Sequence, residues 1–381
     1  MLMNIPKWSD TQQFEVELSD YGRADDCEYL QNNKMKNNDT DIVYNSNSIY
    51  LNISKELRKL NITFMPLSKA ILLSPKLVRR YMGGVVYHND NYYSALNSSM
   101  FTDGTFVRIP RYTKCPINLV TYFKITANCL GQFERTLIII EPYSKGVYFE
   151  GCNSGKLTKA VLHSAVVEIV IHDYSSFKYT TLQNWSSLKS GVYNFVTKRA
   201  LCMGIRSKMV WTQVELGSVI TWKYPSTVLL GVNSNCEFYS LNINNRSQRM
   251  DTGTKCLHLA NGSNSIVLAK SILMGQSVNM FRVLVLNKAK DCRSYIKCDS
   301  LLTGVSCITK TLPIIKLCMH PMKLEYESLN SYITERQFNY CAQRGLNDTD
   351  TIKLVVGGYA NEIIKKLPFE AAVEVAKLMF L

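Results

Sequence analysis

The feature that most constrains the fold is a run of short, strand-like segments between residues 166 and 302. Each segment is rich in Val, Ile, Thr, Tyr, Phe and Trp, and Gly, Asn or Pro separates it from the next. Many short strands at near-regular spacing indicate a β-sandwich, a barrel or a stacked solenoid, and with no repeat of fixed length visible, all three stay open. The predicted strands are 166–171, 178–185, 192–198, 209–215, 218–224, 237–241, 265–272 and 280–285.

The segments that precede this run are patterned differently. Residues 1–60 are polar and rich in Asn and Asp, and we expect a loosely ordered lead with little of the core in it. Residues 61–104 predict a helical segment, with short helices that Pro66 and Pro75 interrupt. Strand patterning then continues over 105–328, which we expect to be one β core.

The carboxyl end, 329–381, changes to a helical period. A capping box at Thr334 and Gln337 opens a helix that stops at Gly345, and Asn347 starts a second helix. Pro368 opens a third, on which we expect one apolar face that carries Phe369, Ala372, Val373, Ala376 and Leu378.

Charge and cysteine content narrow the function classes. Lys and Arg number 44 against 30 Asp and Glu, a net charge of +14 that invites a nucleic-acid partner. The basic residues are scattered and not interleaved with aromatics, so we expect no nucleic acid.

None of the 12 cysteines forms a Cys-x-x-Cys pair, which argues against a zinc ribbon or a ferredoxin cradle. No signal peptide or membrane span is visible, so we expect no membrane contact and reduced thiols.

Residues 151–158 look at first like a phosphate-binding loop. The spacing is one residue short, Leu157 separates Lys156 from Thr158, and a strand follows where a helix is needed. What survives is Cys152, a thiol that we expect in a small, flexible turn within reach of a partner. An ordinary turn cysteine is the alternative.

A second candidate site combines thiols, an imidazole and carboxylates. Soft thiolates suit iron or an iron–sulfur cluster, and carboxylates can complete a labile shell. Because alternate side chains of a strand share a face, only one or two of the thiols are expected to converge. The residues are Cys292, Cys298, Cys307, Cys318, His320, Glu325 and Glu327.

A third candidate consists of polar side chains within the predicted strands. Such residues usually lie on a solvated face, but if they point inward they need partners and could form a polar conduit. They are Gln183, Trp185, Lys198, Gln213 and Glu215.

Long motifs agree in order with one family from about Phe64 to the end. They include residues 181–185, 193–199, 211–213, 217–226, 251–255 and 298–302, with 131–136 upstream and 367–370 downstream. These motifs resemble the SufB group of the SufB/SufD family, which supplies the scaffold subunit of the SUF iron–sulfur assembly system.

This resemblance implies a mainly β fold, a right-handed parallel β-helix with helical ends. It implies a scaffold and not an enzyme, because the ATPase activity belongs to the partner SufC, which binds the helical region 331–381. It also implies pairing with SufD or a second SufB copy, sulfur donation by SufS and SufE, and delivery to apoproteins. The cofactor implied is a transient 4Fe–4S or 2Fe–2S cluster, with reduced flavin as a further cofactor of the complex.

The resemblance also assigns roles to residues. Cys152 matches the thiol that accepts persulfide sulfur, and Cys298 matches the thiol of the cluster-building site, with Glu325 and Glu327 as its carboxylates. The internal sulfur route between the two thiols is lined in the family by residues that correspond to Gln183, Trp185, Lys198 and Lys124.

The sequence departs from the family at several of these positions. Tyr326 replaces a histidine between the two glutamates, Lys124 and Thr126 replace an arginine and an asparagine, and Gln276 replaces another histidine. These changes fit a plastid- or apicoplast-encoded copy working in the stroma, with a bacterial cytoplasmic protein as the alternative. The same changes are also compatible with the alternative that this chain is a non-catalytic, SufD-like structural subunit. A carbohydrate-cleaving solenoid enzyme is a weaker third hypothesis, because paired carboxylates are few.

Overall fold

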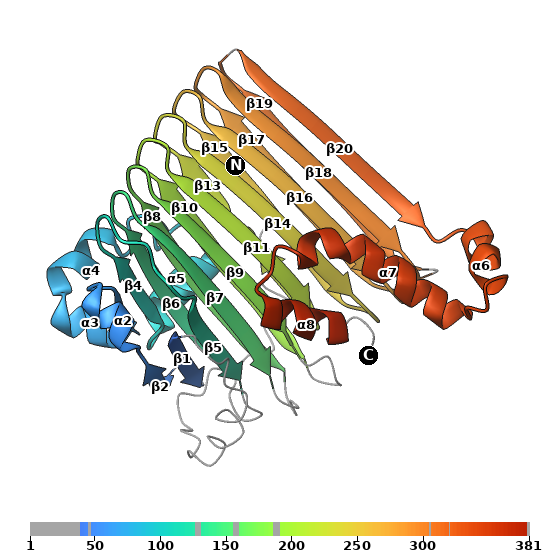
Figure 1. Ribbon diagram of the computed structural model, residues 1–381, viewed down its shortest axis with the longest axis horizontal. Helices are drawn as coiled ribbons and strands as arrows, with labels where there is room; N and C mark the ends of the chain where they lie inside the picture. Colours follow the sequence, from blue (N-terminus) through green and yellow to red (C-terminus); the bar gives the residue numbers. More distant parts are fainter. Residues whose placement is uncertain are drawn as a thin grey trace.

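The computed structural model describes residues 39–44, 47–125, 131–154, 160–185, 191–304, 306–319 and 321–378, with side chains from residue 53 onward except that of Glu370. Within these ranges the strands form two ten-stranded sheets, and from residue 105 onward the chain alternates between them (Figure 1). Each pass through both sheets therefore makes one turn of a parallel β-helix. The predicted β-helix is confirmed, and the sandwich and the barrel are excluded.

The two sheets enclose one elongated interior. Sheet 1 runs in the order β2 (Asn47–Asn52), β1 (Asp39–Tyr44), β5 (Leu119–Ile125), β7 (Lys145–Ser154), β9 (Ser176–Asn184), β11 (Lys208–Leu216), β14 (Asn235–Asn244), β16 (Asn264–Leu273), β18 (Cys292–Leu302) and β20 (Met322–Tyr332). Sheet 2 runs in the order β3 (Thr63–Pro66), β4 (Thr105–Ile109), β6 (Gly131–Ile140), β8 (Val161–Ile171), β10 (Val192–Cys202), β12 (Ile220–Lys223) with β13 (Ser226–Leu229), β15 (Arg249–His258), β17 (Val278–Asn287) and β19 (Ile308–Leu317).

Every strand predicted from the alternation falls on an observed strand, with two refinements. The strand predicted as 218–224 is observed as β12, and Pro225, which cannot donate to the ladder, separates it from β13, a strand that was not predicted. The turns also differ in length: Glu150 pairs with Thr181 one turn on, whereas Gln213 pairs with Ser240. Unequal turns explain why no fixed repeat is visible in the sequence.

The first end of the β-helix is capped by the amino-terminal segment. β1 and β2 pair antiparallel and extend sheet 1 beyond β5, so residues 39–44 and 47–52 form strands where a loosely ordered lead was expected. In the same lead, residues 55–59 form a helix with Leu57 fully buried, and residues 1–38, 45 and 46 lie outside the described residues. Helices then pack against the first turns: α2 (Lys55–Lys59), α3 (Leu67–Leu73), α4 (Pro75–Tyr81) and α5 (Tyr92–Met100). Pro75 separates α3 from α4 as predicted, whereas Pro66 ends β3, a strand within the segment predicted to be helical, and directly precedes α3.

One buried carboxylate anchors this segment to the outer face of sheet 2. Glu168 of β8 accepts the backbone N–H groups of Gly83, Val85 and Val86 at 2.9–3.1 Å. Arg135 of β6 forms an ion pair with the same carboxylate at 2.7 Å. The anchor therefore joins the loop after α4 to the sheet through charge-assisted hydrogen bonds.

Three helices follow at the carboxyl end; the second and third lie across the outer face of sheet 1, and the first lies beyond the end of its last strand (Figure 1). They are α6 (Glu335–Ala342), α7 (Asp348–Ile364) and α8 (Phe369–Leu378), and the capping box of α6 is formed as predicted. The sheet runs on to Tyr332, slightly past the expected core boundary. No helix in the described part of the chain is long and apolar enough to cross a membrane.

The apolar face predicted for α8 is largely turned away from this chain, and a second apolar face, which was not predicted, packs on it. Phe369 and Val373 are exposed, at 79% and 38%, whereas Ala371 and Val375 are fully buried against the sheet. The helix thus presents two apolar faces, and only one of them packs on this chain.

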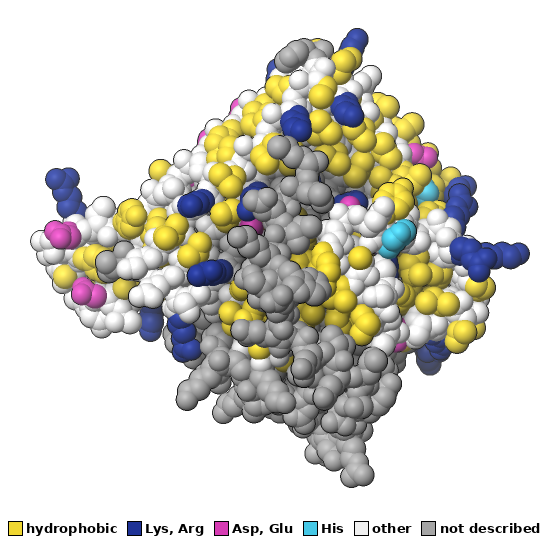
Figure 2. All heavy atoms as spheres, turned by 180° about the vertical axis from the view of Figure 1, so that it is seen from behind, with side chains coloured by type: hydrophobic (Ala, Val, Ile, Leu, Met, Phe, Trp, Pro, Cys, Tyr) yellow, Lys and Arg dark blue, Asp and Glu magenta, His cyan; other side chains and the backbone are white. Residues whose placement is uncertain are grey.

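The last turn is the least covered part of the β-helix. β19 and β20 each end a sheet, and most of their side chains are exposed or half-buried. Ile308, Leu312 and Leu317 are among the apolar residues exposed there. From behind, hydrophobic side chains spread over the upper part of the molecule, with Lys and Arg scattered among them (Figure 2).

Candidate functional site: a polar column inside the β-helix

Three rows of side chains run along the interior wall that sheet 1 provides. Because the strands are in register and alternate residues point inward, each row takes one residue from each turn. The first row is apolar: Tyr148, Tyr179, Trp211, Phe238, Val267 and Ile296. The second row is Glu150, Thr181, Gln213, Ser240, Ala269 and Cys298, and the third is Cys152, Gln183, Glu215, Asn242, Ser271 and Ser300.

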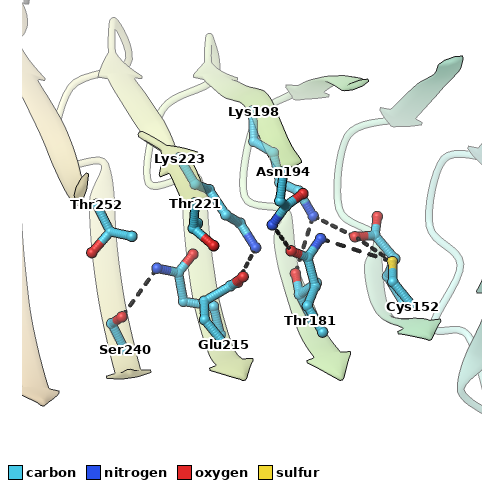
Figure 3. Close-up of polar contacts among 12 residues, drawn as sticks. Cys152, Thr181, Asn194, Lys198, Glu215, Thr221, Lys223, Ser240 and Thr252 are labelled. Carbon is cyan, nitrogen blue, oxygen red and sulfur yellow. Dashed lines mark hydrogen bonds and ion pairs between the residues drawn. The ribbon is translucent and has the colours of Figure 1, made fainter. Parts of the chain in front are cut away.

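The two polar rows, with their partners from sheet 2, form what we call the polar column. All five polar residues of the third sequence candidate lie inside the β-helix and are at most 2% exposed. The hypothesis that they point inward is therefore correct, and the solvated-face alternative is excluded. Figure 3 shows side chains of this column turned toward one another from successive strands.

Cys152 lies inside the column and not in an accessible turn. It is the inward residue near the end of β7, and its side chain is 2% exposed. The expectation of a flexible turn is therefore wrong at Cys152, while residues 155–159 of the same motif lie outside the described residues. Burial, and then the carboxylates of Glu150 and Glu134, raise the pKa of the Cys152 thiol well above its usual range.

Glu150, two residues before Cys152, is held by three donors. Lys198 of β10 donates to Glu150 Oε1 at 2.6 Å, the phenol of Tyr179 donates to Oε2, and the Cys152 thiol lies 3.7 Å from Oε1. Burial opposes ionisation of Glu150, but Lys198 and Lys223 outweigh it and lower the pKa of the carboxyl. Burial also lowers the pKa of Lys198, against the opposing effect of Glu150.

On its other side the sulfur of Cys152 meets the end of a hydrogen-bond chain. Gln183 Nε2 lies 3.8 Å from Sγ, and Gln183 Oε1 accepts from Asn194 Nδ2 at 2.5 Å. His163 Nδ1 lies 2.8 Å from Asn194 Oδ1, and His163 Nε2 lies 3.1 Å from Glu134 Oε1. Burial raises the pKa of Glu134 to about 7 although His163 opposes it.

Further polar pairs continue the column toward Cys298. Lys223 of β12 forms a buried ion pair with Glu215, and Gln213 donates to Ser240 at 3.0 Å. Beyond them, Asn242 donates to Thr252 at 2.8 Å, and Asn279 donates to Ser271 at 3.0 Å.

The column also holds polar atoms with no hydrogen-bond partner among the described residues. The indole N–H of Trp185 is one, and Glu215 Oε2 and Gln213 Oε1 are two others. Trp185 packs with Cys152 in one buried cluster, and its ring centroid lies 4.9 Å from that of His163. Since buried polar groups are normally paired, these atoms are candidates to bind something polar that enters the interior.

Lys124 does not join the column. In the β5–β7 register Lys124 pairs with Asn153 while Phe123 pairs with Cys152, so Lys124 lies on the outward-facing side of β5. The assignment of Lys124 to the internal route is therefore not supported by its position. Thr126, the neighbouring substitution, lies outside the described residues.

Cys298 ends the second row, but the two glutamates do not reach it. Cys298 points inward from β18 and is 3% exposed. In the β18–β20 register Glu325 and Glu327 pair with Tyr295 and Lys297, on the outer side, and Glu327 Oε2 lies 3.3 Å from Lys297 Nζ. The expected convergence of Cys298 with these carboxylates is thus absent, because alternate residues of β20 point to opposite faces.

The other thiols of the second sequence candidate are dispersed. Cys292 is buried near the start of β18, Cys307 is half-buried and Cys318 is exposed, while His320 lies outside the described residues. In the described part of the chain no three His, Cys, Asp or Glu side chains come together as a metal site. Burial, and then Asp299, raise the pKa of Cys298 to about 12.

Sequence reasoning missed several residues of the column. Glu150, His163 and Asn194 were not singled out. Asn194 lies in a predicted strand and His163 in the extension of one, whereas β7, which carries Glu150, was not predicted. Their signal was the period of two: Glu150 precedes Cys152 by two residues, and Asn194 precedes Lys198 by four, so each shares a face with an assigned residue.

Comparison with known proteins agrees with this architecture. Residues 123–359 match the family described as SUF system FeS cluster assembly, SufBD core domain. An iron–sulfur cluster assembly SufBD family protein of Synechocystis is 44% identical over 354 residues, 91% of this chain and 74% of its own length. A chloroplastic SufBD family protein of Arabidopsis thaliana is 40% identical over 98% of this chain and 68% of its own length. The iron–sulfur cluster assembly protein SufB of Plasmodium falciparum is 41% identical over 93% and 76%. This chain therefore belongs to the SufBD family of the SUF system and is a component of iron–sulfur cluster assembly.

Proposed function

We propose that this chain is a scaffold that accepts sulfur at Cys152 and builds an iron–sulfur cluster at Cys298. The observation that carries the proposal is that both thiols face one enclosed interior, in adjacent polar rows of the same sheet. Five strand spacings of about 4.8 Å separate β7 from β18, so sulfur would travel about 24 Å along the column.

The column suits a route for anionic sulfur. Gln183 supplies an N–H group beside Cys152, Trp185 supplies an unpartnered indole N–H in the same cluster, and Lys198 supplies a buried ammonium group. Donors and a cation in a dry interior stabilise an anion such as a persulfide far more than they would in water. Apolar walls on the first row exclude water and so limit loss of reactive sulfur.

At the far end, Cys298 alone cannot hold a cluster. A partner subunit is proposed to complete the shell, and the open last turn is where it would bind. β19 and β20 are edge strands with exposed apolar side chains, and edges of this kind pair readily with another chain. A SufD subunit or a second SufB-like copy is the proposed occupant, and a SufC-type ATPase is proposed to bind the helices α6–α8.

The cluster would be a transient 4Fe–4S or 2Fe–2S cargo that is passed to apoproteins. SufS and SufE would donate the sulfur, and reduced flavin would be a further cofactor of the complex. The proposed location is the plastid stroma, consistent with the chloroplastic name of the Arabidopsis relative, and the bacterial cytoplasm is the alternative. The second candidate function is a SufD-like structural subunit. It is favoured by the outward position of Glu325 and Glu327 and by Tyr326 in place of a histidine.

The test is sulfur loading of the full chain. The protein is incubated anaerobically with a cysteine desulfurase and cysteine, and persulfide is located by mass spectrometry. Cys152→Ser is expected to abolish loading, and Cys202→Ser, which removes another fully buried thiol of the interior, is expected to leave it intact. Equal loading of the wild type and Cys152→Ser would refute the sulfur-accepting role and favour the structural subunit.

A further inference from the structure

We propose that Glu150 is the base that removes the thiol proton of Cys152 when sulfur is transferred to it. This inference rests on the proposed role of Cys152 as sulfur acceptor. It adds a residue that the sequence comparison did not assign and that touches the reacting sulfur directly.

The hydrogen-bond directions around the sulfur point to Glu150. Asn194 Nδ2 donates to Gln183 Oε1 at 2.5 Å, so the amide of Gln183 is oriented with its N–H group toward Cys152 Sγ at 3.8 Å. The sulfur accepts on that side. Its own S–H is directed to the opposite side, where Glu150 Oε1 lies 3.7 Å away.

A base is needed because this thiol does not ionise readily by itself. The thiolate is the nucleophile in sulfur transfer, yet burial keeps the thiol in its neutral form. Cys152 is 2% exposed, so a carboxylate in contact replaces bulk water as the proton acceptor.

The surroundings of Glu150 keep it ionised, so it can take the thiol proton only transiently before the leaving thiolate removes it. The groups that face it are the ammonium of Lys198 on β10, the phenol of Tyr179 on β9 and the more distant ammonium of Lys223 on β12. Glu134 on β6 also acts on this cluster, because its carboxylate contributes to the raised pKa of Cys152.

No other neighbour of the sulfur is suited to the step. Lys198 is a charged donor without a free lone pair, and it already donates to Glu150 and to Thr181 at 3.1 Å. Glu134 and His163 are separated from the sulfur by Asn194 and Gln183, whose amides hold hydrogen bonds but are poor carriers of protons.

The step balances with a donor persulfide, R–S–SH, as the second reactant. The Cys152 proton moves to Glu150 Oε1, and the thiolate attacks the terminal sulfur of the donor. The donor S–S bond breaks, a new bond forms to Cys152 Sγ, and R–S⁻ leaves and takes the proton back from Glu150. The products are Cys152–S–SH and R–SH; the Cys152 sulfur is oxidised to a persulfide while the donor is reduced to a thiol.

The experiment compares wild type with Glu150→Gln in the full chain, with glutathione persulfide as donor. The rate of persulfide formation on Cys152 is measured by mass spectrometry in a single turnover from pH 6 to pH 10. The wild-type rate is expected to vary little with pH, whereas the variant is expected to be about 100-fold slower at pH 7 and to rise about tenfold per pH unit.

Two further variants separate chemistry from folding. Glu150→Gln leaves Lys198 buried without its counterion, so Glu150→Gln with Lys198→Met removes both charges and is expected to show the same steep pH profile. Glu168→Gln makes the same neutral change in a buried ion pair on the outer face of sheet 2, outside the polar column, and is expected to keep the shallow wild-type profile.

The outcomes distinguish this inference from the proposed function. If wild-type Cys152 takes up no persulfide, the sulfur-accepting role fails and the inference fails with it. If the wild type is loaded and Glu150→Gln is loaded at the same rate with the same pH profile, Glu150 is not the base, while the role of Cys152 stands.

Discussion

Cys298 of β18 and Tyr326 of β20 face the same interior from adjacent strands. The register pairs Cys298 with Ser328 and Ile296 with Tyr326, so the phenol lies diagonally next to the thiol while Glu325 and Glu327 point outward. Tyr326 packs against the interior core, and burial raises the pKa of its phenol. The phenol beside Cys298 therefore stays protonated at neutral pH.

The first prediction is that Tyr326→His increases the amount of iron the chain retains. A neutral imidazole offers a lone pair at pH 7, whereas the phenol must first lose a proton. Iron per chain is measured after anaerobic loading with ferrous iron and gel filtration. Tyr326→Phe is the matched control and should retain as much iron as wild type; a loss as large as that in Cys298→Ser would show that the phenolate is a ligand.

The same assay tests the position of the glutamates. Glu325→Gln should leave iron retention unchanged, because the carboxylate lies on the far side of β20 from Cys298. A clear loss of iron would mean that β20, an edge strand, shifts its register by one residue and turns the glutamates inward.

The second prediction concerns pH and Glu134. Its pKa is raised from 4.5 to about 7 in the folded protein, so the folded state binds this proton more tightly than the unfolded chain does. The protonated Glu134 carboxyl therefore stabilises the folded state fully below about pH 4.5. As the pH rises through 7 this contribution is lost, and the free energy of unfolding falls by up to about 3 kcal/mol. Glu134→Gln cannot ionise and should remove this loss.

Urea unfolding of wild type and Glu134→Gln at pH 5 and pH 8 provides the measurement. The free energy of unfolding of Glu134→Gln minus that of wild type should be larger at pH 8 than at pH 5. Identical pH dependence in the two proteins would show that Glu134 titrates normally despite its burial.

The third prediction is that Glu168→Gln loosens the amino-terminal cap. The change removes the charge that balances Arg135 in a fully buried pair, which should cost about 3 kcal/mol or more of the free energy of unfolding. Glu141→Gln is the control, because its pair with Arg108 is partly exposed and should be worth less than about 1 kcal/mol. If urea unfolding shows the same loss in free energy of unfolding for both changes, Glu168 does not anchor the amino-terminal segment.

The sequence alone was sufficient for much of the fold but not for the direction of its side chains. The alternation predicted the strands, and the capping box and Asn347 fixed two helix starts. Parallel strands that are covered on both faces carry apolar residues on both, so alternation does not say which face is the interior. The resemblance to a family resolved the choice of solenoid.

The candidate site shows the same limit. Cys152 was expected in a turn because Gly and Asn surround it, but the neighbouring strands pair through that segment and draw it into β7. Glu325 was grouped with Cys298 by closeness in sequence, whereas the pairing of β18 with β20, a long-range property, decides the face on which each lies.

The last prediction concerns α8 and the proposed ATPase partner. Phe369 is 79% exposed at the start of the helix, and Val373 lies one turn on along the same side, so together they form an unoccupied apolar anchor pair. An aromatic anchor that enters a partner's groove is typically worth about 2 kcal/mol or more, about 30-fold in affinity. Phe369→Asp should therefore abolish co-purification with the SufC-type ATPase while the melting temperature stays unchanged. Val375→Asp is the contrasting variant, because Val375 is fully buried against sheet 1 and a charge there should detach α8 and lower the melting temperature. Full binding by Phe369→Asp would place the contact elsewhere on α6–α8.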